Sequence, residues 1–299
     1  MIPAELLRAL SIFAEPPEPE HARVAGLLDL GDGIDGSAYA ELFVFQLPPY
    51  ASIYVGPEGW MGGEARERIA GFWRAVGRTP SAEPDHLSVL LGLYAALSEE
   101  HEQATGPTAA LAAEACGALL HEHLAPWVFA YLDHAGDLAV GGYKRWAELL
   151  RETLAREAER LGPPATLPVH LRAASGLPDP RSEGGEAFLK GLLAPVRSGV
   201  ILTRAALGTI AREHGLGLRA GERRFALEGL LGQDSQATLA ALAALAAREE
   251  LAHRRRQGLL GETSRLLARR AGDAARLLMK LAADSASAVS ATRKATNSG

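Results

Sequence analysis

Apolar residues recur along the chain with the spacing of amphipathic helices. Leucine and alanine fill most of these positions, at intervals of three and four residues that share one helix face. No stretch shows the apolar–polar alternation that indicates a sheet. The pattern therefore predicts an all-α protein with helices over residues 4–14, 20–30, 37–47, 64–76, 84–103, 107–135, 141–161, 185–194, 203–214, 221–232, 234–256 and 261–283.

Proline and glycine indicate where these helices end. Pro126 should interrupt the long 107–135 pattern near Ala125. GDGIDG (31–36) should be an interhelix loop, with Ser37 capping the next helix. We expect a first domain at 1–165, a Pro/Gly-rich linker at 166–184, a helical C-terminal extension at 185–284 and a disordered tail at 285–299.

Charge is distributed unevenly along the chain. Residues 1–165 hold 24 acidic and 11 basic residues, a net charge of −13, whereas residues 251–299 hold 3 and 10, a net charge of +7. An acidic body repels nucleic acid and attracts cationic partners such as a basic peptide. A single cysteine, no signal-peptide pattern and no long uncharged apolar run indicate a soluble cytoplasmic protein without membrane insertion.

Several motifs associated with enzymes are absent or incomplete. GDGIDG matches the dinucleotide fingerprint in letters, but the residues before it predict a helix rather than a strand. In HEHLA, His121 and His123 are two residues apart and would face different sides of a helix, which does not suit a metal site. Cys116 lies in an Ala-rich helix, where a packed thiol is expected. We expect no catalytic residue, no cofactor and no metal.

Three local clusters remain as candidates for function. Tyr39, Leu42, Phe43 and Gln46 share one helix face, which ordinary core packing explains for Leu42 and Phe43. The tyrosine hydroxyl needs a polar partner and suits the edge of a groove. The second cluster is the rigid Pro-Pro exit at 48–49, which presents Tyr50.

The third cluster is Glu83-Pro84-Asp85-His86, at the expected start of the 84–103 helix. Pro84 suits the first helical position and Asp85 suits the positive end of the helix dipole, so these residues could form no more than a stable helix start. That explanation does not account for His86, which follows the carboxylate residue Asp85 and could bind a partner's backbone or guanidinium group.

These motifs resemble those of the TorD/DmsD/NarJ family of redox-enzyme maturation chaperones. Y-x-x-L-F is matched by residues 39–43, and E-P-x-D-H is matched by Glu-Pro-Asp-His at 83–86 except for its x position, which this chain lacks; both stand in the family's order along the chain. Supporting matches are Pro-Pro-Tyr-Ala-Ser at 48–52 and His-Leu-Ala-Pro-Trp at 123–127. The similarity covers about residues 1–165, and the remainder resembles a C-terminal extension.

The resemblance implies a TorD-like helical bundle with additional C-terminal helices and a cytoplasmic chaperone rather than an enzyme. Such a protein binds the signal peptide, often twin-arginine, and the apo catalytic subunit of a molybdopterin oxidoreductase, as monomer or dimer, and assists cofactor insertion before assembly or export. By the same resemblance, a peptide groove would involve Tyr39, Leu42, Phe43, Tyr50, Glu83, Asp85, His86 and Trp127.

Two other functions stay open from the residues alone. A helical nucleotide-binding enzyme could use Asp85 and His86 as an acid–base pair, although the sequence offers no nucleophile or metal to go with them. A regulatory module could bind nucleic acid or protein through the basic C-terminal part, where residues 202–218 faintly resemble a helix-turn-helix.

Overall fold

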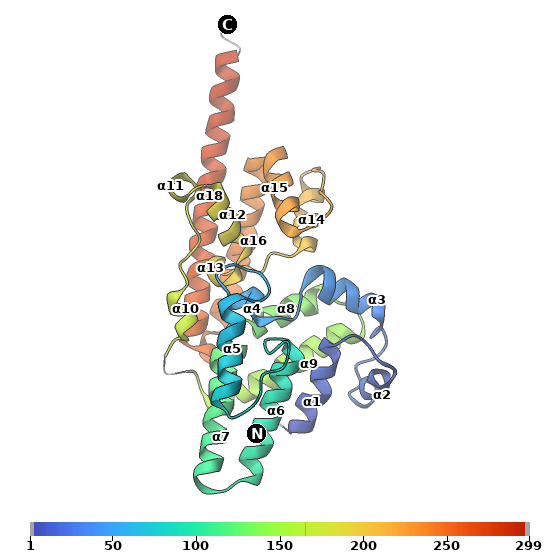
Figure 1. The fold of residues 1–299 in the computed structure, drawn as a ribbon. Helices are drawn as coiled ribbons and strands as arrows, with labels where there is room; N and C mark the ends of the chain where they lie inside the picture. Colours follow the sequence, from blue (N-terminus) through green and yellow to red (C-terminus); the bar gives the residue numbers. More distant parts are fainter. Residues whose placement is uncertain (1–2, 165, 297–299) are drawn as a thin grey trace. The chain divides into compact units, whose positions relative to one another are not determined.

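The computed structural model describes residues 3–164 and 166–296, and within these ranges it contains helices and no β-strand. The chain divides into two compact units (Figure 1). The first contains the residues up to Ala174 together with Arg256–Ser264, and the second contains Ser175–Arg255 and the residues from Arg265 onward. The all-α prediction is confirmed. The boundary falls inside the expected 166–184 linker, and a short later segment returns to the first unit.

The described residues of the first unit form fourteen helical segments. They are α1 (Ala4–Ser11), η1 (Ile12–Ala14), α2 (Pro19–Leu27), α3 (Gly36–Tyr39), η2 (Ala40–Gln46), α4 (Ala51–Val55), α5 (Gly63–Ala75), α6 (Leu87–Gln103), α7 (Gly106–Ala118), η3 (Leu119–Leu124), α8 (Val128–Leu138), α9 (Gly142–Leu161), α10 (Val169–Ala173) and α17 (Gln257–Leu260). The helix α6 packs against α1 and α7, and α8 packs against α9.

Large aromatic residues form much of the core of this unit, and their polar atoms are bonded to the backbone. The Trp146 indole donates to the Leu10 carbonyl over 2.8 Å, and the Tyr131 hydroxyl donates to the Leu47 carbonyl over 3.1 Å. These bonds join α9 to α1 and α8 to the segment after η2. Burying such rings without partners for their N–H and O–H groups would cost free energy.

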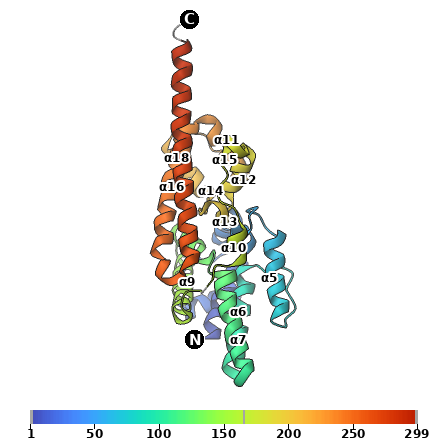
Figure 2. The same ribbon diagram turned by 90° about the vertical axis from the view of Figure 1, so that its left-hand side faces the viewer.

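The second unit contains α11 (Pro180–Glu183), α12 (Gly185–Leu193), α13 (Pro195–Ser198), α14 (Arg204–Glu213), α15 (Arg223–Gln233), α16 (Ser235–Arg255) and most of α18 (Glu262–Thr296). Figure 2 shows α16 and α18 side by side. A Cβ atom on Gly272 would lie 2.9 Å from the Glu250 carboxyl group, so the two helices are closely packed there. Leucine and alanine side chains from α12, α14, α15, α16 and α18 form one core.

Several local expectations need correction. The tail from residue 285 was expected to be disordered, but α18 continues through it to Thr296, since it contains helix-compatible Ala and Ser and no Pro. Residues 297–299 lie outside the described residues. The cap of α3 is Asp35 instead of Ser37, because the Asp35 carboxylate accepts the Ser37 and Ala38 N–H groups, each over 2.9 Å.

The expected 107–135 helix is interrupted near Ala125, as predicted. The π-helix η3 ends at Leu124, and α8 begins at Val128 after the turn that contains Pro126. A second π-helix, η2, occupies most of the helix predicted at 37–47. Only Leu42, Phe43 and Leu47 of this segment are buried, and the Val44 and Phe45 side chains are 58% and 57% exposed.

Candidate functional site

Two of the sequence clusters lie side by side because their backbones pair. The Ala51 N–H donates to the Asp85 carbonyl over 2.9 Å, and the Leu87 N–H donates to the Pro49 carbonyl over 2.8 Å. Proline keeps residues 48–49 out of a helix, and the residue before each proline is held extended. The pairing therefore brings Tyr50 opposite His86, although the two motifs are more than thirty residues apart in the chain.

Asp85 is a buried cap of helix α4. Its side chain is 2% exposed, and one carboxylate oxygen accepts the Ser52 N–H over 3.1 Å. The sequence suggested that Asp85 lies in the first turn of its own helix, but α6 begins at Leu87. The difference arises because residues 85 and 87 are bonded to the 49–51 backbone and cannot also form a helical turn. Asp85 therefore joins the two segments.

His86 is buried at the start of α6, with 4% of its surface exposed. Its Nδ1 atom lies 2.7 Å from the Ser88 hydroxyl oxygen and 3.5 Å from a carboxylate oxygen of Glu15. Burial lowers the pKa of His86, and the carboxylates of Glu15, Glu83 and Asp85 oppose that shift. His86 is therefore neutral near pH 7.

Tyr50 and Glu83 form the accessible side of this arrangement. The Tyr50 hydroxyl donates to a Glu83 carboxylate oxygen over 2.9 Å, and the Tyr50 ring meets the His86 ring edge-on with centroids 4.8 Å apart. Burial first, and then the bond to Glu83, raise the pKa of Tyr50 far above its ordinary value. Tyr50 therefore remains a neutral donor at physiological pH.

Tyr39 belongs to the same neighbourhood. It is half-buried, and its pKa is raised first by burial and then by the nearby carboxylates of Glu15 and Glu83. We call Glu15, Tyr39, Tyr50, Glu83 and His86 the Tyr–Glu cluster. In the described part of the chain, neither Glu15 nor Glu83 forms an ion pair with lysine or arginine. Within the described residues, the cluster thus carries two partly or fully exposed carboxylates that no lysine or arginine neutralises.

Leu42 and Phe43 lie behind the cluster in the hydrophobic core. They are 3% and 2% exposed, and the Phe43 ring packs edge-on against Tyr143 and Trp146, with centroids 5.3 and 5.6 Å away. Phe43 also contacts the Tyr39 ring at 5.1 Å. These two residues hold η2 and Tyr39 in place and have almost no exposed surface to offer a partner.

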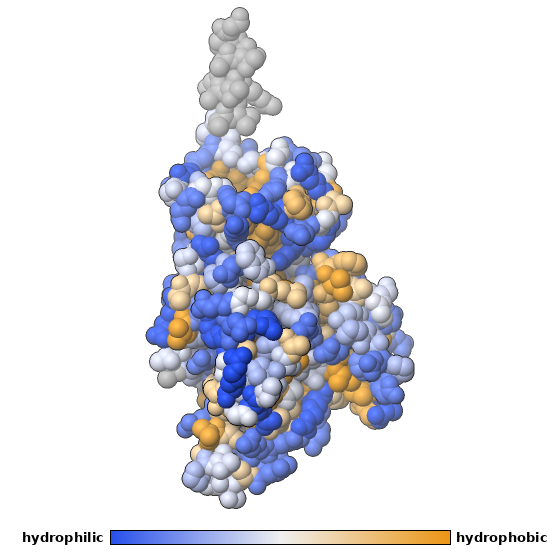
Figure 3. Space-filling view, in the orientation of Figure 1, coloured by the Kyte–Doolittle hydropathy of each residue, from blue (hydrophilic) through white to orange (hydrophobic). Residues whose placement is uncertain are grey.

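The exposed apolar residues on η2 are Val44 and Phe45, which the sequence analysis did not select. Figure 3 shows apolar surface on the visible face where α3 and η2 lie, while the face over α5 is strongly hydrophilic. A π-helix bonds each N–H to the carbonyl five residues earlier, as in the 2.7 Å bond from Leu47 to Leu42. In this wider turn, Leu42 and Phe43 face the core, whereas Val44 and Phe45 face the solvent.

Trp127 packs against Tyr54 of α4 and Tyr131 of α8, behind the Tyr–Glu cluster. Its ring stacks on Tyr54 with centroids 5.1 Å apart, and its indole N–H donates to the His123 carbonyl over 2.8 Å. Tyr54 belongs to the helix that Asp85 caps, so Trp127 supports the site through α4. His123 is also buried, and burial lowers its pKa to about 4.

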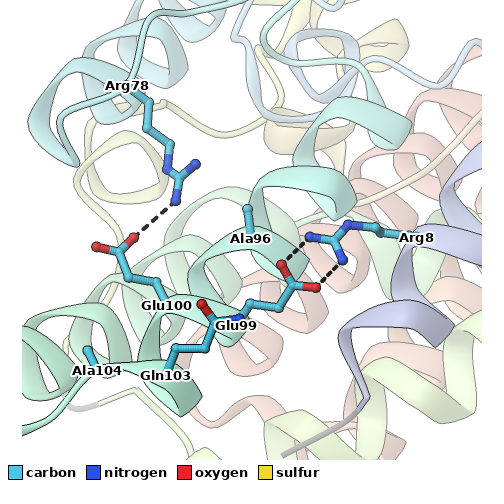
Figure 4. Close-up of a pocket in the computed structure, with 7 residues that line it drawn as sticks. All are labelled: Arg8, Arg78, Ala96, Glu99, Glu100, Gln103 and Ala104. Carbon is cyan, nitrogen blue, oxygen red and sulfur yellow. Dashed lines mark hydrogen bonds and ion pairs between the residues drawn. The ribbon is translucent and has the colours of Figure 1, made fainter.

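The other candidate chemistry does not form a site. The described residues include no group of three or more His, Cys, Asp or Glu side chains placed to hold a metal ion. A shallow pocket of 620 Å³ beside α6 is lined by Arg8, Arg78, Glu99 and Glu100, but each arginine is already paired with a glutamate (Figure 4). Its charges are therefore satisfied internally.

Two arginines of α15, the helix after the 202–218 segment, are already bonded within the second unit. In α15, the Arg224 guanidinium is bonded to Glu186 and Glu228, and Arg223 donates to the Leu202 carbonyl over 3.0 Å. A recognition helix needs such side chains free to reach base edges.

Comparison with known proteins supports the chaperone resemblance. Residues 36–133 match the family model described as nitrate reductase delta subunit. Over this stretch, about a third of its length, the chain is similar to that family. The family is one of redox-enzyme maturation chaperones of the NarJ/TorD type. The match includes every selected site residue from Tyr39 to Trp127, but it leaves out Glu15 and the second unit. No curated protein matches the chain.

Among the described helices, none combines the length and apolar character needed to cross a membrane.

Proposed function

We propose that this protein is a cytoplasmic, system-specific chaperone for a molybdopterin oxidoreductase. It binds the N-terminal signal peptide of the apo catalytic subunit and holds the subunit while its cofactor is inserted, before assembly or export. The family match supports the maturation role, and the proposed peptide ligand follows from the chemistry of the Tyr–Glu cluster.

The main support for this ligand is the pair of carboxylates, Glu15 and Glu83, which form no ion pair with a lysine or arginine among the described residues. A twin-arginine leader combines guanidinium groups with an apolar stretch. Carboxylates bind guanidinium in oriented, often bidentate hydrogen bonds, and tyrosine hydroxyls add further acceptors. The net charge of −13 over residues 1–165 would attract such a peptide and make its binding sensitive to salt.

The apolar stretch of the peptide would rest on Val44 and Phe45, which are exposed on η2. Burial of apolar surface contributes about 25 cal/mol per Å², so two such side chains supply a modest but useful share of affinity. In this proposal Tyr39 contacts both parts of the ligand, because it lies between the carboxylates and η2.

Isothermal titration calorimetry with a synthetic peptide tests the proposal. The probe carries two adjacent arginines followed by a leucine-rich stretch, and its control has both arginines replaced by glutamine. We expect binding of the arginine peptide and at least tenfold weaker binding of the control. Affinity for the arginine peptide should fall as salt rises from low to physiological concentration.

Matched variants identify the surface. Glu83→Gln should weaken binding about tenfold, and Phe45→Ser should weaken it severalfold, because both side chains are exposed and neither supports the core. Glu114→Gln removes the same charge from an exposed position of α7 and should leave the affinity unchanged. Equal affinity for both peptides, or equal effects of Glu83→Gln and Glu114→Gln, would refute the proposal.

A further inference from the structure

Glu15 reaches the cluster from a segment outside both the sequence motifs and the family match. It follows η1 directly, and the proline after it favours the extended backbone that Glu15 adopts, with φ −96° and ψ 159°. Its carboxylate accepts a hydrogen bond from the Ser88 hydroxyl, while 47% of its side chain remains exposed. A rigid segment therefore holds this carboxylate against the start of α6.

Glu15, Ser88 and His86 form a continuous chain of hydrogen bonds. Ser88 has one hydroxyl proton, which the Glu15 carboxylate accepts. The Ser88 oxygen also lies 2.7 Å from Nδ1 of His86. Because the hydroxyl proton is already directed toward Glu15, Nδ1 must carry a proton and donate it to Ser88. In the opposite tautomer two lone pairs would face each other at this short distance.

One contact favours the opposite tautomer. The Ser88 backbone N–H lies 3.3 Å from Nδ1, where an unprotonated Nδ1 would accept it and cap α6. That distance is longer than the roughly 2.7–3.2 Å of ordinary hydrogen bonds from N–H groups. The 2.7 Å contact is the stronger one, and an ionised partner strengthens the chain further. The Nδ1–H form therefore prevails.

The remaining ring nitrogen, Nε2, then carries a lone pair. It makes no hydrogen bond to any residue that the structure describes. The charged groups around the ring are the carboxylates of Glu15, Glu83 and Asp85, and the Tyr50 ring covers one side. Negative groups surround an acceptor atom, so the fitting ligand is a positively charged N–H donor.

We propose that Glu15, acting through Ser88, fixes His86 in the Nδ1–H tautomer, so that Nε2 accepts a hydrogen bond from a guanidinium group of the bound peptide. The identity of the ligand rests on the proposed function, whereas the tautomer is a property of the free protein. Glu15 and Ser88 are thus positioning residues, and His86 is the residue that contacts the ligand.

Nitrogen NMR of the full chain labelled with ¹⁵N-histidine tests the tautomer without any ligand. The His86 signals are assigned by their loss in His86→Gln. At pH 7.5 we expect the Nδ1–H form in the wild type. Ser88→Ala keeps the backbone N–H at position 88, which then donates to Nδ1, so the ring should change to the Nε2–H form. Glu15→Gln should lower the pKa of His86, and Glu114→Gln should not.

The arginine peptide then tests the ligand. Ser88→Ala should weaken its binding about tenfold, because Nε2 would then carry a proton and face the N–H donors of the peptide's guanidinium group. A wild-type ring in the Nε2–H form, or a tautomer unchanged by Ser88→Ala, overturns the positioning role. Wild-type binding with no loss in Ser88→Ala overturns the contact through Nε2. If the wild type fails to bind the peptide while the tautomer is as expected, the proposed function fails and the positioning role stands.

Discussion

Replacing Asp85 with alanine should destabilise the first unit, because this carboxylate joins two chain segments. Asp85 is 2% exposed and Ser52 is fully buried, so the Ser52 N–H would lose its acceptor where water cannot replace it. A buried donor without a partner costs about 1–3 kcal/mol, and the loss of an ordinary helix cap costs about 0.5–2 kcal/mol. The two figures describe the same bond, so we expect a loss of about 2 kcal/mol.

The Asp85→Asn variant separates the effect of losing the hydrogen bond from the effect of losing the negative charge. Asp85→Asn keeps an acceptor oxygen for Ser52, so it should cost about 1 kcal/mol or less. Glu114→Ala serves as the control for removal of a carboxylate, because Glu114 is exposed on α7. It should change stability by about 0.5 kcal/mol at most.

Tryptophan fluorescence during urea unfolding measures the stability of the first unit, where Asp85 lies. All 4 tryptophans, Trp60, Trp73, Trp127 and Trp146, belong to the first unit, so their emission reports its unfolding and not that of the second. Asp85→Ala should lower the urea midpoint with little change in slope. A midpoint equal to that of the wild type would refute the capping role.

Three further predictions concern the core, pH and the second unit. Phe43→Ala should cost about 3–5 kcal/mol by the same assay, since the ring packs between Tyr143 and Trp146; a loss below 1 kcal/mol would contradict this packing. Burial lowers the pKa of His123 to about 4, below its unfolded value, so its contribution to stability is fully present above about pH 6.5 and declines by up to about 3 kcal/mol toward pH 4. His123→Gln should reduce this pH dependence, as measured by urea titrations at several pH values. Gly199→Ala should increase hydrogen exchange in the second unit, because Gly199 has φ 71° and a Cβ atom would lie 2.5 Å from the Ala271 nitrogen; unchanged exchange would contradict that clash.

The sequence was a good guide to the helices because their apolar stripes are local. A helix such as α9 repeats buried leucines and aromatics over twenty residues, and its observed bounds differ from the expected 141–161 by one residue. The interruption near Pro126 was equally predictable, since the ring removes a backbone donor. The same reasoning failed for α18 beyond residue 285, where the absence of an apolar period was taken as disorder.

The Tyr–Glu cluster was only partly predictable, because it depends on contacts between distant segments. The backbone bonds that place Tyr50 opposite His86 leave no trace in the spacing of either motif. The π-helix is a change of hydrogen-bond register, which the order of apolar residues in η2 does not reveal. Glu15 was missed because a glutamate beside prolines looks like any solvated loop, although those prolines were a sign of a fixed backbone.

The arrangement separates the residues that build the site from those that can bind. Asp85, Phe43 and Trp127 are almost fully buried, and each holds a backbone segment in place: the start of α4, η2, and the far side of α4. Their replacement should reduce stability and peptide affinity together. Glu83 and Phe45 are exposed, so their replacement should reduce affinity alone. His86 belongs to both groups, because it is buried beside Tyr50 yet its Nε2 atom is bonded to none of the described residues. If Ser88→Ala weakens peptide binding without lowering the stability of the first unit, that result is the clearest evidence that the site has a binding role.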